Sequence, residues 1–203
     1  MKNYLCSALI LLAMVSCDNK KEAVKTSYKT PDMKLASDVM TPEVLWSFGR
    51  IGSVSVSPDQ KTLLYDITYF NKEEDRSYSD IYVMNLADGK SKQLTDTDYK
   101  EFGETWTSDG KIAFMSSKSG SVQLWEMNAD GSGLTQLTNV EGGIGGFIFS
   151  PDKSKLLFLK DVKLEQDVHD LHPDLPKANA RLIDGQVYRH WNDWVEAYTH
   201  PFV

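Results

Sequence analysis

The chain of 203 residues is 41% hydrophobic and 25% charged, an ordinary composition for a globular protein with a buried core. Its formal net charge of −7 argues against a nucleic-acid partner, because such partners require clustered Lys and Arg side chains that neutralise phosphates. Both cysteines, Cys6 and Cys17, lie near the N-terminus, so packing rather than disulfide bonds must hold the rest of the chain.

Residues 1–16 have the features of a secretory signal peptide. Lys2 precedes an apolar run over residues 5–13, which is too short to serve as a permanent membrane span. Cys17 directly follows small residues, as the lipidated cysteine of bacterial lipoproteins does. We therefore expect a lipid on Cys17 that anchors the chain in a bacterial cell envelope, facing the periplasm or the cell surface. The alternative is a secreted protein in which Cys17 is incidental.

Residues 17–40 are rich in Lys, Glu, Thr and Ser and contain few apolar side chains, so we expect a flexible linker there. Folded structure is expected from residue 41 onward. Thr41 is a favourable helix N-cap, Pro42 suits the first helical position, and an acidic residue follows. The sequence therefore predicts a short helix that ends at Gly49.

A short phrase occurs three times and organises the remaining chain. Ser-Pro-Asp at residues 57–59 and again at 150–152 joins two apolar, alternating runs, and Thr-Ser-Asp at 107–109 is a variant without proline. This pattern is typical of β-hairpins, because Pro and Asp both favour tight turns. We therefore expect Asp59 and Asp152 to be structural turn residues.

The spacing of a second phrase predicts the blades of a β-propeller. Gln-Leu-Thr occurs at residues 93–95 and again 43 residues later, and about 40 to 45 residues is the length of one four-stranded blade. Residues 71–77 are polar and are expected to form a solvated loop. The expected strands are 51–56, 62–70, 80–86 and 91–94 in the first blade, 104–107, 112–116, 122–127 and 134–137 in the second, and 146–150, 155–160 and 186–190 in the third.

The Ser-Pro-Asp hairpins and the Gln-Leu-Thr strand ends resemble the repeats of TolB-like propellers. The sequence thus predicts an all-β fold, a partial TolB-like β-propeller of about three to four blades over residues 41–203, preceded by the signal peptide and the linker. Because closed propellers typically have about four to eight blades, we expect this chain to be a piece of a longer protein.

Residues 173–194 carry a more specific resemblance. They contain Pro-Asp-Leu-Pro-Lys-Ala at 173–178 and Val-Tyr-Arg-His-Trp-Asn-Asp-Trp at 187–194, where Asn192 occupies a position that is more often Asp. With the blades, this passage resembles the S9 (prolyl oligopeptidase) family of serine peptidases, and within it the bacterial dipeptidyl-peptidase-like and acylaminoacyl-peptidase-like enzymes. The resemblance implies a propeller that covers an α/β-hydrolase domain with a Ser-Asp-His triad and gates the entry of short peptides.

No catalytic residue of that triad is expected in this chain, because none of its serines has the Gly-x-Ser-x-Gly context of the nucleophile. The leading interpretation is the propeller part of a lipid-anchored S9 serine exopeptidase, whose missing C-terminal hydrolase domain would be its partner. The chain alone is expected to be inactive. The alternative is a non-enzymatic TolB-like propeller lipoprotein that binds peptides, glycans or a partner protein in the cell envelope.

The candidate substrate-binding residues are Arg189, His190, Trp191 and Trp194. An Arg can pair with a carboxylate and indoles form flat apolar walls, although a packed structural strand is the alternative. We expect no metal site and no cofactor, because the His and Asp residues of 169–174 lack a zinc-binding spacing and are better explained as a solvated insertion. The glycine-rich residues 142–146 precede a strand rather than a helix and are expected to connect two blades.

Overall fold

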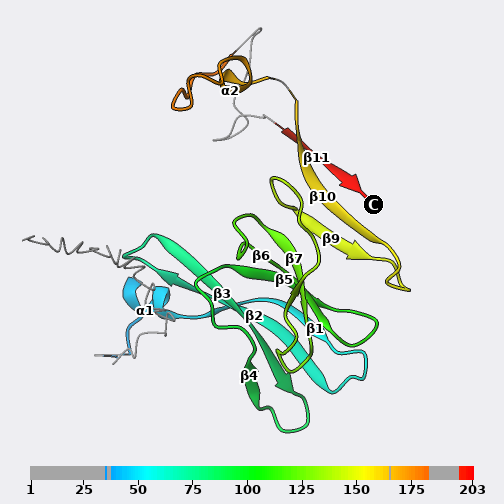
Figure 1. The fold of residues 1–203 in the computed structure, drawn as a ribbon. Helices are drawn as coiled ribbons and strands as arrows, with labels where there is room; N and C mark the ends of the chain where they lie inside the picture. The colour runs from blue at the N-terminus through cyan, green and yellow to red at the C-terminus, as the bar shows by residue number, and fades with distance from the viewer. Residues whose placement is uncertain (1–34, 36–37, 165, 183–196) are drawn as a thin grey trace, which may run out of the picture.

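The computed structural model describes residues 35, 38–164, 166–182 and 197–203. These residues form three antiparallel sheets, here called blades A, B and C, whose strands follow the chain order (Figure 1). Blade A contains β1 (Arg50–Val56), β2 (Thr62–Asn71), β3 (Arg76–Asn85) and β4 (Ser91–Gln93); blade B contains β5 (Glu101–Trp106), β6 (Ile112–Ser116), β7 (Gln123–Met127) and β8 (Thr135–Gln136); and blade C contains β9 (Gly146–Phe149), β10 (Leu156–Lys163) and β11 (Ala197–Phe202). The expected all-β architecture of successive blades is confirmed.

The short helix α1 (Pro42–Ser47) precedes blade A, as the sequence predicts. Thr41 is its N-cap, and the Oγ1 atom of Thr41 accepts a hydrogen bond from the amide of Val44 at 3.4 Å. Trp46 of the helix contacts Phe70 of β2 edge-to-face, with ring centroids 5.3 Å apart. An aromatic contact therefore attaches the helix to the first sheet.

The three repeated turns have the same internal hydrogen bond. In each turn a hydroxyl donates to the carboxylate two residues later: Ser57 to Asp59 at 2.6 Å, Thr107 to Asp109 at 2.5 Å, and Ser150 to Asp152 at 2.6 Å. The residue that follows each carboxylate has a left-handed backbone, with φ values of 60° at Gln60, 78° at Gly110 and 58° at Lys153. Asp59 and Asp152 are therefore turn residues, which confirms the prediction.

Strand β3 begins earlier than the sequence predicts. Asn71 of β2 pairs with Arg76 of β3, so the hairpin extends into the region 71–77 that was expected to be a solvated loop. The Asn71 side chain accepts hydrogen bonds from the amides of Glu73 and Glu74 at 3.0 and 3.3 Å, which tightens the turn. Charged side chains are compatible with this ladder because the backbone makes the pairing.

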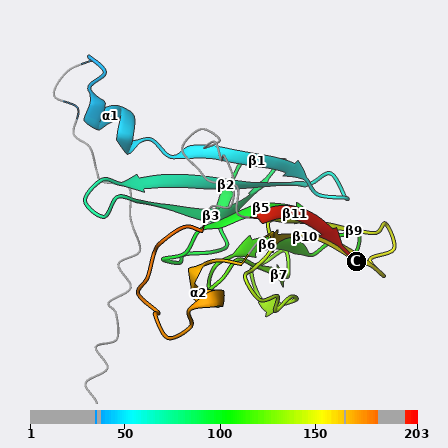
Figure 2. The same cartoon turned by 90° about the horizontal axis from the view of Figure 1, so that it is seen from above.

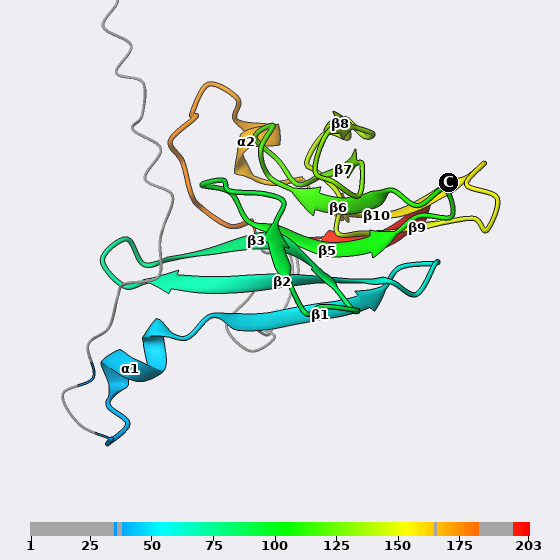
Figure 3. The ribbon, with the colours of Figure 1, turned by 90° about the horizontal axis from the view of Figure 1, so that it is seen from below.

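Blade B lies between the other two blades (Figure 1), and its strand β5 lies alongside β2 and β3 of blade A (Figures 2 and 3). Apolar side chains are buried on both faces of blade B. Successive residues of β6 alternate between the two contacts, and all five are buried. The contact with blade A is formed by Leu64, Ile81, Val83, Ile112, Phe114 and Met127. The contact with blade C is formed by Ala113, Met115, Leu124 and Ile144, against which Phe147, Phe149, Leu156 and Phe158 pack.

A long insertion separates β10 from β11. It contains α2 (Val168–Leu171), whose N-cap Asp167 forms a capping box with Asp170. Figure 1 shows α2 beyond the end of β10, away from the sheets. Residues 186–190, which were expected to resume the third sheet, lie outside the described residues. In the part of the chain that the structure describes, β11 is the third strand of blade C and pairs with β10.

The connector between blades B and C contains two adjacent glycines with positive φ, 81° at Gly142 and 86° at Gly143. A Cβ atom on Gly142 would meet nothing within 4 Å, whereas one on Gly143 would lie 2.9 Å from the carbonyl oxygen of Val122. That same oxygen accepts a hydrogen bond from the amide of Ile144 at 2.8 Å. The two glycines thus have similar backbone conformations but differ in the space available for a side chain.

We expect Gly142→Ala to lower the free energy of unfolding by about 1 kcal/mol, because a Cβ is strained in the left-handed region. Gly143→Ala should lower it by about 3 kcal/mol, because the clash also disrupts the hydrogen bond that Val122 accepts. Urea unfolding followed by tryptophan fluorescence measures both losses. Equal losses for the two variants would contradict the close approach of Gly143 to the strand.

Candidate functional site

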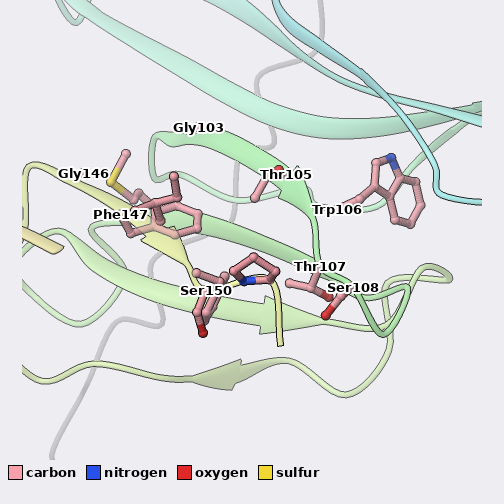
Figure 4. Close-up of a pocket in the computed structure, with 12 residues that line it drawn as sticks. Gly103, Thr105, Trp106, Thr107, Ser108, Gly146, Phe147 and Ser150 are labelled. Atoms are coloured by element: carbon pink, nitrogen blue, oxygen red, sulfur yellow. The ribbon is translucent and has the colours of Figure 1, made fainter. Parts of the chain in front are cut away.

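A cleft of about 480 Å³ opens between β5 of blade B and β9 of blade C. None of the side chains that line it is charged; they combine apolar surface with a few hydroxyl groups (Figure 4). The lining residues are Gly103, Thr105, Trp106, Thr107, Ser108, Met115, Gly146, Phe147, Ile148, Phe149, Ser150 and Pro151. Both strands belong to the repeated hairpins, so the repeat itself forms the two walls.

A bulge in β5 shapes one wall of the cleft. The pairing of β5 with β6 shifts register between Phe102 and Thr105, and Gly103 in this bulge has a φ of 65°. Trp106 is held at the end of the strand, because its Nε1 donates a hydrogen bond to the carbonyl oxygen of Ser55 in blade A at 3.3 Å. The position of this wall therefore depends on the contact between blades A and B.

An ion-pair network joins the turns at one end of the cleft. Lys153 of blade C contacts both carboxylate oxygens of Asp109 in blade B, at 2.8 and 2.9 Å, and also contacts Glu126. Hydrogen bonds from Lys153 and Thr107 lower the pKa of Asp109 to about 2. Burial opposes ionisation of Glu126, but the hydrogen bonds from Lys111 (2.8 Å) and Lys153 outweigh it and lower the pKa of that group.

The described residues of the cleft provide groups for binding but not the groups for covalent hydrolysis. Two serines line it, and the hydroxyl of Ser150 is already committed to Asp152 in the turn. A serine nucleophile needs an adjacent general base, and the twelve lining residues include no histidine or carboxylate. A neutral cleft of this kind is suited to an uncharged, partly apolar ligand such as a stretch of peptide chain.

A half-buried carboxyl group, Asp80, and a buried one, Glu101, lie at the junction of blades A and B and are polar features that sequence reasoning missed. Burial raises the pKa of Asp80 to about 6 and that of Glu101 to about 7. Thr97 contacts both, through its amide to Asp80 at 3.2 Å and its hydroxyl to Glu101 at 3.2 Å. The 43-residue repeat aligns Asp80 with the uncharged Gln123 of blade B, a signal that could have identified the site.

The structure does not test the predicted substrate-binding cluster. Arg189, His190, Trp191 and Trp194 lie outside the described residues, as do the proposed signal peptide over 1–16 and the lipidation site Cys17. These assignments stay predictions.

The histidine-rich insertion uses its carboxylates locally. Asp167 and Asp170 cap α2, and Lys163 contacts both of them, with a distance of 2.8 Å to Asp167. Within the ranges that the structure describes, no group of three or more His, Cys, Asp or Glu side chains is arranged to hold a metal ion. Nor does any helix in those ranges have the length and apolar character that crossing a membrane requires.

Comparison with solved structures agrees with the propeller-like arrangement of the blades. No family model matches the chain. An acylaminoacyl peptidase in complex with Z-Gly-Gly-Phe-chloromethyl ketone matches with a TM-score of 0.50 and 21% sequence identity, over 61% of this chain and 20% of that one. At this identity the match concerns the fold alone, and the fold is that of a propeller-like segment.

Two curated relatives add a similarity in sequence. Dipeptidyl-peptidase 5 of Porphyromonas gingivalis is 44% identical over 165 residues, which cover 81% of this chain and 24% of the relative. Dipeptidyl-peptidase 5 of Porphyromonas endodontalis is 34% identical over 197 residues, 96% of this chain and 28% of the relative. The chain thus spans about a quarter of the length of these relatives. The chain is thus similar to a segment of S9-like peptidases, and its fold is propeller-like, as the resemblance implied.

Lys153→Gly should lower the free energy of unfolding by about 2 kcal/mol, because it leaves the buried Glu126 with one cation instead of two and separates the turns of blades B and C. Gln60→Gly is the matched control, because Gln60 has the same left-handed backbone and is exposed. We expect the control to change stability by less than about 0.5 kcal/mol. Thermal and urea unfolding would show the difference, and equal effects would contradict a stabilising role for the network.

Proposed function

We propose that this chain is the propeller part of a lipid-anchored S9 serine exopeptidase that removes dipeptides from short peptides. The observation that carries the proposal is the 44% identity with dipeptidyl-peptidase 5 of Porphyromonas gingivalis over 81% of the chain. In this proposal the propeller gates the access of short peptides to a Ser-Asp-His hydrolase domain of the same gene product.

The cleft between β5 and β9 supports a role in peptide binding. Its walls are uncharged, and peptide backbone can be accommodated by hydroxyl groups and apolar surface without a specific charge. Arg189, His190, Trp191 and Trp194 are proposed to contribute further contacts to the substrate. The chemical step is assigned to the hydrolase domain, because the described residues that line the cleft include no nucleophile with an adjacent base.

The proposed location is the bacterial cell envelope. The support comes from the sequence of residues 1–16, from Cys17 at the start of the linker, and from the bacterial peptidases among the relatives. A lipid on Cys17 would hold the propeller near a membrane surface through the linker over residues 17–40. Metabolic labelling with a fatty-acid analogue, compared with a Cys17→Ala variant, would test this attachment.

The complete gene product should release the chromophore from dipeptide-linked substrates that have a free N-terminus, and a serine-reactive organophosphate should abolish this release. The 203-residue chain alone should release none. N-acetylated versions of the same substrates are the matched control, because an exopeptidase requires the free amine. Chromophore absorbance against time measures each reaction.

Two results would contradict the proposal. One is a complete reading frame with no Gly-x-Ser-x-Gly, Asp and His downstream of the blades. The other is a complete product that binds peptides but hydrolyses none of the dipeptide substrates, which would favour the non-enzymatic binding propeller instead.

A further inference from the structure

Two carboxyl groups from different blades meet at the junction of blades A and B. Asp66 lies on β2 and Glu104 on β5, and these residues are only 6% and 5% exposed. The hydroxyl of Ser53 on β1 is 2.5 Å from Oε1 of Glu104 and 3.4 Å from Oδ1 of Asp66. The Ser53 hydroxyl thus joins the two carboxyl groups, and the charge of Asp66 contributes to the raised pKa of Glu104.

A bulge in β1 creates this meeting point. The pairing of β1 with β2 shifts register between Ile51 and Val54. Within this bulge, the amide of Ser53 donates a hydrogen bond to Oδ1 of Asp66 at 2.8 Å. Gly52 sits directly over the carboxylate, because a Cβ atom at that position would lie 2.3 Å from Oδ1 of Asp66. The backbone therefore closes one side of the pair and leaves no room there for another side chain.

The pair has fewer hydrogen-bond donors than carboxylate oxygens. Ser53 offers two hydrogens, one on its amide and one on its hydroxyl, for four carboxylate oxygens. The Oε2 atom of Glu104 is buried and has no hydrogen-bond partner among the described residues. In that part of the chain no Lys, Arg or His forms an ion pair with either carboxylate. Two adjacent buried charges without a cation are strongly unfavourable.

The other ionisable groups of the surrounding elements do not supply that cation. Arg50 of β1 is stacked 4.4 Å from the ring centroid of Phe70, and Arg76 of β3 donates to the carbonyl oxygen of Asp98. Strands β6 and β9 contain no ionisable residue. The remaining ionisable groups on the elements packed against the pair are Glu43 on α1, Tyr65 and Tyr69 on β2, Tyr78, Asp80 and Tyr82 on β3, and Glu101 on β5.

We propose that Asp66 and Glu104 share one proton and form a pH-dependent clasp between blades A and B. The shared proton neutralises one of the two carboxyl groups, while the amide of Ser53 donates to Asp66 and its hydroxyl donates to Glu104. Loss of the proton places a second negative charge in the junction and weakens the contact of β5 with β1 and β2.

The direction of the pH effect follows from the geometry. Burial, and the neighbouring Asp66, raise the pKa of Glu104 from 4.5 to about 7. Between these two values the folded chain binds a proton that the unfolded chain does not, so stability falls as the pH rises. The contribution of the clasp is complete below about pH 4.5, where the unfolded chain is also protonated, and is lost by about pH 7.

Glu104→Gln tests the clasp, because the amide keeps the shape of the side chain but cannot titrate. Between pH 5 and pH 7 one bound proton changes the unfolding equilibrium constant tenfold per pH unit. We expect the variant to lose this one-proton component, and Glu141→Gln, which removes an exposed carboxylate, to retain it. Urea unfolding of the full chain at several pH values gives the slope. An unchanged slope in Glu104→Gln would overturn the proposal.

The sharing of one proton by Asp66 and Glu104 is tested by the Asp66→Asn variant and by the double variant that combines Asp66→Asn with Glu104→Gln. If one proton belongs to the pair, the double variant loses no more pH dependence than either single variant, and loss of two protons would overturn sharing. If a variant does not fold, the protonation of Glu104 can be measured directly in the wild-type chain, by carbon NMR of labelled glutamate carboxyl groups. The Glu104 carboxyl resonance should titrate near pH 7, and titration near pH 4.5 would refute the clasp.

Discussion

The structure depends on the burial of both faces of β6, because this strand connects the three sheets into one body. Its residues alternate between the contact with blade A, where Phe114 is buried, and the contact with blade C, where Met115 is buried. A single blade cannot bury its apolar faces by itself, so each blade relies on its neighbour. The cleft, the ion-pair network and the carboxyl pair all lie at these two junctions, and their geometry is set by the apolar contact.

The two junctions satisfy their polar groups in opposite ways. At the junction of blades B and C, Lys153 forms ion pairs with Asp109 and Glu126, which favours the ionised carboxylates. The pKa of Asp109 is lowered to about 2. The stabilisation by this ion pair is therefore lost only as the pH falls from about 4 toward 2. At the junction of blades A and B, no cation of the described residues forms an ion pair with Asp66 or Glu104, which favours a protonated carboxyl. Acidification therefore strengthens one junction before it weakens the other, and both hold together best in mildly acidic solution.

Local sequence was sufficient for the turns and the blades but not for the polar contacts between blades. The Ser-Pro-Asp hairpins were predictable because their hydrogen bonds join residues only two positions apart, as in Ser57 and Asp59. The Ser53–Glu104 contact joins residues 51 positions apart on different sheets, so no local pattern indicates it. The start of β3 at Arg76 was missed because a charged stretch suggests a loop, although the backbone can pair while the side chains remain in solvent.

In the proposed peptidase, peptide binding and catalysis belong to different domains because of the groups that the blades contain. Consecutive hairpins place the walls of the cleft at a fixed separation, and the uncharged lining makes that cleft tolerant of different side chains. Hydrolysis of a peptide bond requires a nucleophile, a base and an oxyanion site held within a few tenths of an ångström, which the turn serines do not provide because Ser150 is bonded to Asp152. In the proposed enzyme the blades therefore select and position the peptide, and a separate domain supplies the chemical step.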